Sequence, residues 1–139
     1  RVAMVGDDTW LELFARDAFT AGAQPFPSFN VKDLDSVDAG VRLHLRSALK
    51  RPGDWDVLIG HFLGVDHAGH TFGVESAAMA RKLGENDGDI RAVAAAMAAD
   101  EAYNRTLLVV MGDHGMTTEG DHGGGTPEET DSFLLAYHP

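Results

Sequence analysis

The hydrophobic pattern along the chain predicts four short buried strands. Residues 1–5 form an apolar run that ends at Gly6, and residues 55–64 are almost continuously apolar. Two further apolar runs occupy residues 106–111 and 132–137. Runs of this length without strict polar alternation are typical of strands that are buried on both faces of a sheet.

Helical periodicity fills the spaces between these runs. Apolar positions recur every four residues over 35–49, which predicts an amphipathic helix. A brief helix is predicted to begin at Asp8 or Thr9, and the proline-containing segment 21–30 is predicted to be a loop. A longer helix is predicted over roughly 75–103, and its apolar side consists of Met79, Leu83, Ile90, Val93 and Met97.

Alternation of strands and helices in this order predicts an α/β fold around a mostly parallel sheet flanked by helices. A length of 139 residues is that of about one domain, and no internal boundary or repeat interrupts the sequence. In open α/β sheets, ligands bind beyond the carboxyl ends of the strands. The segments that follow the strands are therefore the first place to look for a site.

Two glycine-rich segments of this kind gather histidines and aspartates. Residues 64–73 follow the second strand and residues 112–123 follow the third, and both are predicted to be loops. The candidate metal ligands in them are Asp66, His70, Asp113, His114 and His122. Oxygen and nitrogen donors without sulfur suit zinc, and manganese less exclusively.

Five ligands are too many for one tetrahedral ion and too few for two, so a dinuclear centre would need further ligands upstream of Arg1. His67 is a weaker candidate that could support a ligand or touch substrate. Asp121 either orients His122 or is a solvated loop acid. His61 is predicted to be a core histidine. Any one of these residues could instead cap a helix or bind backbone, and it is their joint pattern that favours a site.

Charge and composition disfavour several classes of function. The net charge of -11 disfavours binding to nucleic acid, and an anionic substrate would need a strongly positive group such as a metal ion in the site. The chain has no cysteine, so disulfides and thiolate metal sites are excluded. Its longest apolar run, residues 92–99, is too short to span a membrane. Asn104 begins an N-glycosylation sequon.

The segments HFLGVDHAGHTFG and VVMGDHGMTTEGDHGG resemble the metal sites of the alkaline phosphatase superfamily. Together with GDDTW and PSFNVKDLDSVDAGV, they resemble the ethanolamine phosphate transferases of GPI-anchor biosynthesis, most closely the transferase 3 branch, with the transferase 2 branch a close rival. The resemblance implies that residues 1–139 are the C-terminal part of a single alkaline-phosphatase-like catalytic domain. It also implies two zinc ions, one held by Asp66, His70 and His122 and the other by Asp113 and His114.

The implied reaction moves phosphoethanolamine from phosphatidylethanolamine, through a covalent phospho-threonine, to a mannose of the GPI glycolipid, the third in the transferase 3 branch. The nucleophilic threonine and a further aspartate are expected upstream, because no residue here matches that motif. Thr9 in GDDTW does not match it either. The resemblance further implies an endoplasmic reticulum membrane protein with this domain in the lumen and a small membrane partner subunit.

Two other functions are compatible with the same residues. A soluble metal-dependent phosphodiesterase or phosphatase of the superfamily would use water as the acceptor. A non-catalytic metal-binding fragment would hold the ions without a nucleophile, and the isolated residues 1–139 are expected to be inactive for that reason.

Overall fold

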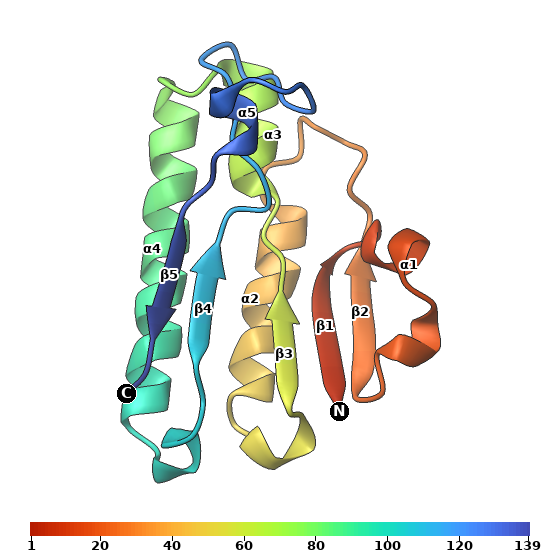
Figure 1. Cartoon of the computed structure of the whole chain (residues 1–139), viewed down its shortest axis with the longest axis vertical. Helices are drawn as coiled ribbons and strands as arrows, with labels where there is room; N and C mark the ends of the chain where they lie inside the picture. The colour runs from red at the N-terminus through yellow and green to blue at the C-terminus, as the bar shows by residue number, and fades with distance from the viewer. The chain divides into compact units, whose positions relative to one another are not determined.

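The computed structural model describes all 139 residues as two compact units, Arg1–His67 and Ala68–Pro139. The first unit holds a parallel three-stranded sheet in the order β2-β1-β3, made of β1 (Val2–Asp7), β2 (Gly22–Phe26) and β3 (Val57–Gly60) (Figure 1). Because all three strands are parallel, their carboxyl ends share one edge of the sheet. The predicted α/β class with a parallel sheet flanked by helices is confirmed.

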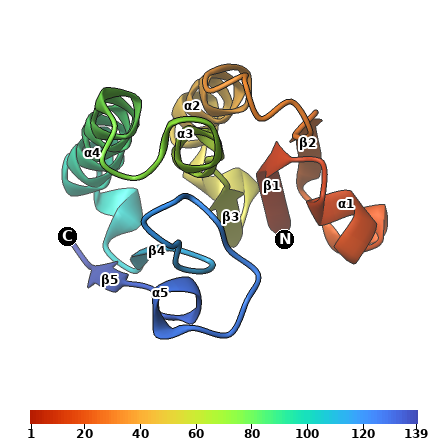
Figure 2. The same ribbon diagram turned by 90° about the horizontal axis from the view of Figure 1, so that it is seen from above.

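Helix α2 (Ser36–Ala48) covers one face of this sheet, as Figure 2 shows from above. Its apolar positions Val37 and Val41 are buried against Val5 of β1, and Phe26 and Leu45 pack around them. The four-residue apolar spacing therefore identified the core-facing side of this helix correctly. Short helix α1 (Trp10–Leu13) begins after Thr9, as predicted, and 3-10 turns occupy Arg16–Ala18 and Pro52–Asp54.

Two expectations about this unit are wrong. Segment 21–30 was expected to be a loop, yet Gly22–Phe26 pairs with β1 as strand β2. The strand expected over 55–64 is only Val57–Gly60, because helix α3 (Gly64–Phe72) already begins at Gly64. The first histidine-rich segment is thus a helix and not a loop, and Asp66 and His70 lie one turn apart on it.

The second unit contains the remaining elements. Helix α4 (Ala77–Ala98) begins at Ser76, whose hydroxyl accepts the amide of Met79, and a 3-10 turn follows at Glu101–Tyr103. Strands β4 (Leu108–Met111) and β5 (Leu134–Tyr137) form an antiparallel pair, and short helix α5 (Pro127–Thr130) precedes β5. No helix reaches the length and apolar content that a membrane crossing requires.

The buried side of α4 differs from the expected one. Met79 and Met97 are buried as predicted, but Leu83 is 53% exposed. Lys82 is fully buried instead and donates to Glu85 at 2.9 Å. This ion pair lowers the pKa of the Glu85 carboxyl, and it lets the helix bury a lysine where an apolar residue was expected.

Gly40 of α2 provides a test of the packing in the first unit. A Cβ at this position would overlap the ring of Phe26, whereas a Cβ at Gly84 in α4 would meet nothing within 4 Å. We expect Gly40→Ala to lower the free energy of unfolding by about 1–2 kcal/mol, because overpacking outweighs the gain in helix propensity. Gly84→Ala should raise it by up to about 1 kcal/mol.

Urea unfolding of the chain and of both variants measures these changes. A Gly40→Ala variant as stable as the Gly84→Ala variant would show that α2 does not pack on β2 this closely.

Candidate metal centre

The start of α3 is fixed by a buried carboxylate from another helix. Oδ1 of Asp38 in α2 accepts the backbone amides of Leu63 at 2.8 Å and Gly64 at 3.0 Å. Asp38 is only 1% exposed. The first amides of a helix have no partner within it, and a carboxylate there also interacts favourably with the helix dipole. Asp38 therefore sets where α3 begins and, with it, where Asp66 lies.

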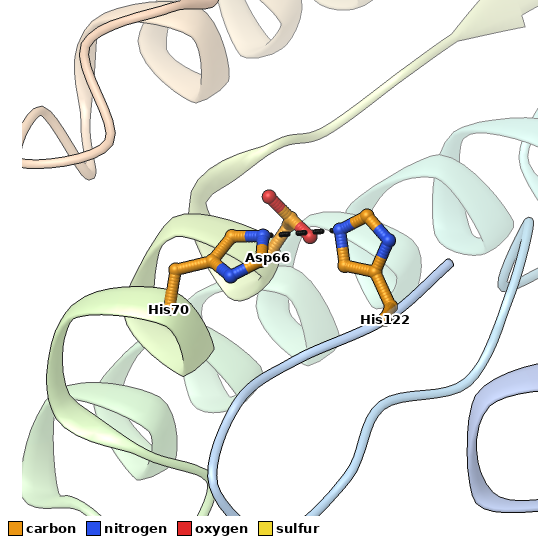
Figure 3. Close-up of side chains that lie close together, drawn as sticks. All are labelled: Asp66, His70 and His122. Carbon is orange, nitrogen blue, oxygen red and sulfur yellow. Dashed lines mark hydrogen bonds between the residues drawn. The ribbon is translucent and has the colours of Figure 1, made fainter. Parts of the chain in front are cut away.

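Asp66 and His70 share one side of α3, and His122 approaches them from the loop that follows β4 (Figure 3). A carboxylate oxygen of Asp66 and one ring nitrogen of each histidine all lie within 4.8 Å of one another. The Nε2 atoms of His70 and His122 are 3.0 Å apart. Spacing of four residues on a continuous helix brings the first two together, because such residues are neighbours on its surface.

Two glycines allow the loop and the helix to come this close. A Cβ at Gly69 would overlap the sulfur of Met116, and a Cβ at Gly120 would overlap the backbone of Gly69. Gly120 also has φ of +95°, a conformation that glycine adopts without strain. Gly69 lies inside α3 and provides room for the loop that carries His122.

Asp113 and His114 form a second pair of donors, in the second unit. The Nδ1 atom of His114 lies 2.8 Å from the carbonyl oxygen of Gly115, so Nδ1 carries the proton and donates it. That tautomer leaves Nε2 of His114 with a lone pair, 3.6 Å from Oδ2 of Asp113. The ring of His114 stacks on that of His122 with centroids 3.9 Å apart, which places the pair beside the first group.

The glycine run after His122 is held by one carboxylate. Glu129 of α5 accepts the amide of Gly124 at 2.8 Å, and it accepts both the amide and the hydroxyl of Thr126 in a capping box. The Thr126 hydroxyl and then these amides hold the pKa of the Glu129 carboxyl below its ordinary value. Glu129 thereby fixes the chain two residues beyond His122.

The two weaker candidates have different surroundings. His67 is 3% exposed and its Nδ1 lies 2.8 Å from the carbonyl oxygen of Asp33, so it is anchored to the segment before α2. The Asp33 carboxylate accepts the hydroxyl and amide of Ser36, and these bonds lower its pKa. Asp121 is exposed, and the hydrogen bonds it makes to Thr117 use its backbone rather than its carboxylate.

Two contributors to the geometry were not singled out from the sequence, and the surroundings of a third residue differ from those expected. Asp38 and Glu129 position the segments that carry the candidate ligands, and His61 is not a simple core histidine. The His61 side chain is 26% exposed and accepts the indole N–H of Trp10 at 2.8 Å. Only the capping box TPEE over 126–129 left a sequence signal, a threonine followed three residues later by glutamate.

The donor set fits a zinc ion. Zinc–nitrogen bonds of about 2.0–2.1 Å at tetrahedral angles put two ligand nitrogens roughly 3.3 Å apart, close to the separation of the His70 and His122 nitrogens. Two facing imidazole nitrogens share at most one proton between them, and a cation satisfies both lone pairs at once. One carboxylate and two imidazoles also match the hard-to-borderline preference of zinc and manganese.

Comparison with known proteins identifies relatives over nearly the whole chain. Residues 8–133 match the family model described as type I phosphodiesterase / nucleotide pyrophosphatase. The chain is 50% identical over its full length to the catalytic subunit of GPI ethanolamine phosphate transferase 3 from Homo sapiens, of which it covers 12%. No solved structure matches the chain significantly.

In Eremothecium gossypii the two transferase branches are about equally similar to the chain. Over 98% of the chain, GPI ethanolamine phosphate transferase 3 from Eremothecium gossypii is 44% identical, and the chain covers 13% of it. Over 97% of the chain, transferase 2 from the same fungus is 45% identical, and the chain covers 16% of it. The chain thus spans about an eighth of the length of the transferase 3 relatives it matches.

Removal of the Asp38 carboxylate should destabilise the junction before α3. We expect Asp38→Ala to lower the free energy of unfolding by about 2 kcal/mol, because two backbone amides lose their acceptor. Asp38→Asn retains an oxygen at the same place and should lose less. Urea unfolding followed by circular dichroism measures both, and equal stability of wild type and Asp38→Ala would contradict the role of this carboxylate.

Protonation of the Glu129 carboxylate at low pH should weaken the hydrogen bonds that hold the loop after His122. A carboxyl whose pKa is lowered by folding contributes stability above its unfolded pKa, and that contribution is lost as pH falls through the folded value. Amide hydrogen exchange at Gly124 and Thr126 should therefore become less protected, relative to the intrinsic rate, as pH falls below about 4.3.

Glu129→Gln is the matched control, because its side chain does not titrate. Its protection at these two amides should be weaker at neutral pH and should not change in the acid range. A wild-type loop whose protection is independent of pH would contradict the contribution of the charged carboxylate.

Proposed function

This chain belongs to the type I phosphodiesterase / nucleotide pyrophosphatase family, and from that premise we propose that it is part of the catalytic domain of a phosphoethanolamine transferase of GPI-anchor biosynthesis. The convergence of Asp66, His70 and His122 is the observation that carries the proposal. In the proposed reaction, phosphoethanolamine passes from phosphatidylethanolamine to a mannose of the GPI glycolipid, the third in the transferase 3 branch. In the first step an upstream threonine hydroxyl attacks the phosphorus and expels diacylglycerol, and in the second a mannose hydroxyl attacks the phosphothreonine and releases the threonine.

We assign the side chains to two groups. Asp66, His70 and His122 would hold one zinc ion, and Asp113 and His114 would contribute to a second. When bound, such ions neutralise phosphoryl oxygens and lower the pKa of an attacking hydroxyl. Manganese is an alternative occupant, since the donors are oxygen and nitrogen alone.

The protein's own contribution is to present these donors in a fixed arrangement. Helix α3 spaces Asp66 and His70 by one turn, and the bond from His114 to Gly115 keeps the Nε2 lone pair of His114 available. The two carboxylates bring negative charge to the centre and the imidazoles bring neutral donors. A phosphodiester anion would otherwise be repelled by a chain with net charge of -11, so cations at this place are needed for it to bind.

Hydrolysis is the second candidate reaction, because the matching family is named for phosphodiesterases. In that case water replaces the mannose hydroxyl as the acceptor. The same site residues serve both reactions, and the difference lies in which acceptor reaches the phosphorus. We place the transferase in the endoplasmic reticulum membrane with this domain in the lumen and with a small membrane partner subunit, as an extension of the same proposal.

An assay of the complete protein that contains this chain tests the function. We expect transfer of labelled phosphoethanolamine from phosphatidylethanolamine to a mannose-containing GPI glycolipid to exceed its release into water. His70→Ala or His122→Ala should remove about one zinc equivalent per molecule and lower transfer at least a hundredfold, because these imidazoles hold the ion that promotes the reaction.

His138→Ala is the matched control, since His138 is an exposed histidine near the end of β5. It should retain both zinc, measured by elemental analysis, and activity. Release of free phosphoethanolamine with no glycolipid product would support the hydrolase instead. Unchanged zinc content in both alanine variants would refute the ligand assignment.

A further inference from the structure

The tripeptide Asn104–Arg105–Thr106 lies in the second unit, between the 3-10 turn Glu101–Tyr103 and strand β4. It is the one place in the chain where an asparagine is followed two residues later by serine or threonine, and the residue between them is not proline. Tripeptides of this form accept N-linked oligosaccharides on surface loops. Neither the candidate metal centre nor the proposed reaction makes use of it.

The backbone of this segment is held by its main-chain hydrogen bonds. The carbonyl oxygen of Tyr103, a residue that is only 1% exposed, accepts the amide of Thr106 at 2.8 Å. The amide of Asn104 donates to the carbonyl oxygen of Glu101 at 3.0 Å. Nε2 of His138 lies 3.1 Å from the carbonyl oxygen of Asn104. Asn104 thus contributes its main chain to the turn, and its side chain is not needed to hold it.

The two side chains that define the tripeptide are available for modification. Asn104 and Arg105 are exposed, and Thr106 is half-buried. Neither the carboxamide of Asn104 nor the hydroxyl of Thr106 makes a hydrogen bond within the protein. An oligosaccharide on the carboxamide nitrogen would therefore extend into solvent, and no internal hydrogen bond would have to break to admit it.

The conformation of the turn does not explain why residue 104 is asparagine. Asparagine is often found at the end of a helical turn because it tolerates the left-handed conformation, or in a turn because its side chain bonds to the backbone. Asn104 has φ of −57° and ψ of −8°, the ordinary right-handed conformation that most residues adopt. Its side chain forms no cap, so the fold leaves the chemistry of the carboxamide unused.

The turn is remote from the donors in the loop that follows β4. Asn104 precedes the amino end of this strand, whereas Asp113 and His114 follow its carboxyl end (Figure 1). A strand rises about 3.4 Å per residue, so the two ends of β4 are roughly 10 Å apart. An oligosaccharide at Asn104 would therefore leave these two donors accessible.

We propose that Asn104 carries an N-linked oligosaccharide in the complete protein. This proposal rests on the lumenal placement of the domain in the proposed function, because N-linked oligosaccharides are attached in the lumen. In the transfer, the carboxamide nitrogen of Asn104 forms a bond to C1 of the first sugar and loses a proton. The bond from C1 to the diphosphate of a lipid-linked oligosaccharide donor breaks, and the lipid diphosphate leaves. The hydroxyl of Thr106 belongs to the acceptor that is recognised.

The complete protein, purified from eukaryotic cells, tests the site. Peptide N-glycosidase F removes the oligosaccharide and leaves aspartate in place of the asparagine that carried it, which mass spectrometry of the peptide around residue 104 detects. We expect this conversion in wild type only after the enzyme is added. Asn104→Gln and Thr106→Ala should each abolish the modification, and Thr106→Ser, the matched control, should retain it because it keeps the hydroxyl.

Activity should not depend on the oligosaccharide, because the donors after β4 lie at the other end of the strand. Asn104→Gln should therefore transfer phosphoethanolamine at the wild-type rate per molecule. Resistance of the domain to protease added to sealed microsomes reports its side of the membrane without reference to the oligosaccharide.

These measurements separate the failure of the site from the failure of the proposed function. A domain that is protected from protease but unmodified at Asn104 would overturn the site and leave the lumenal placement standing. A domain that is digested in sealed microsomes, and unmodified, would overturn both. A modified Asn104 in a protein that transfers no phosphoethanolamine would support the site and count against the transferase.

Discussion

The hydrogen bonds from the amides of Leu63 and Gly64 to the buried Asp38 carboxylate are the constraint on which the candidate metal centre depends. Helix α2 is held on β1 by Val37 and Val41, so the carboxylate of Asp38 has a fixed position relative to the sheet. The amides at the start of α3 need an acceptor from outside that helix, and only one starting point satisfies them. Asp66 lies on the first turn of α3, so its position within the first unit follows from that starting point.

The loop that carries His122 is positioned by two glycines, whose lack of side chains lets the backbones come close. Gly69 and Gly120 let the loop backbone touch α3, and this contact brings His122 within 3.0 Å of His70. Glu129 then holds the glycines that follow, where the backbone has little preference of its own. The Gly69–Gly120 contact thus holds the chain before His122, and Glu129 holds the chain after it. Positioning of this kind favours metal binding, because less order then has to be imposed on the ligands when the ion binds.

The parts of the fold and of the candidate site that could be predicted from the sequence are those determined by residues close together in the chain. The carboxyl-end location of the histidines was predictable, because it follows from apolar runs that end at known residues. The helical state of 64–72 was not, since its glycines disfavour a helix locally and the Asp38 contact comes from 25 residues away in sequence. Strand β2 was missed because of Pro25, which is tolerated since β2 is at the edge of the sheet. The apolar pattern of α4 predicted that Leu83 is buried, but Lys82 is buried instead, because Glu85 pairs with its ammonium group.

The acidity of the chain bears on how the proposed metal centre would bind its substrate. The phosphate of a phosphoethanolamine diester is negative, so the proposed site must present positive charge to it. At Asp66 and Asp113, carboxylates would attract the cations that bind the phosphate. A lysine or arginine near these two carboxylates would bind the phosphate without a metal, but it would also neutralise the carboxylates. The excess of 22 acidic over 11 basic residues is therefore compatible with an anionic substrate, because the acids select its cationic partners.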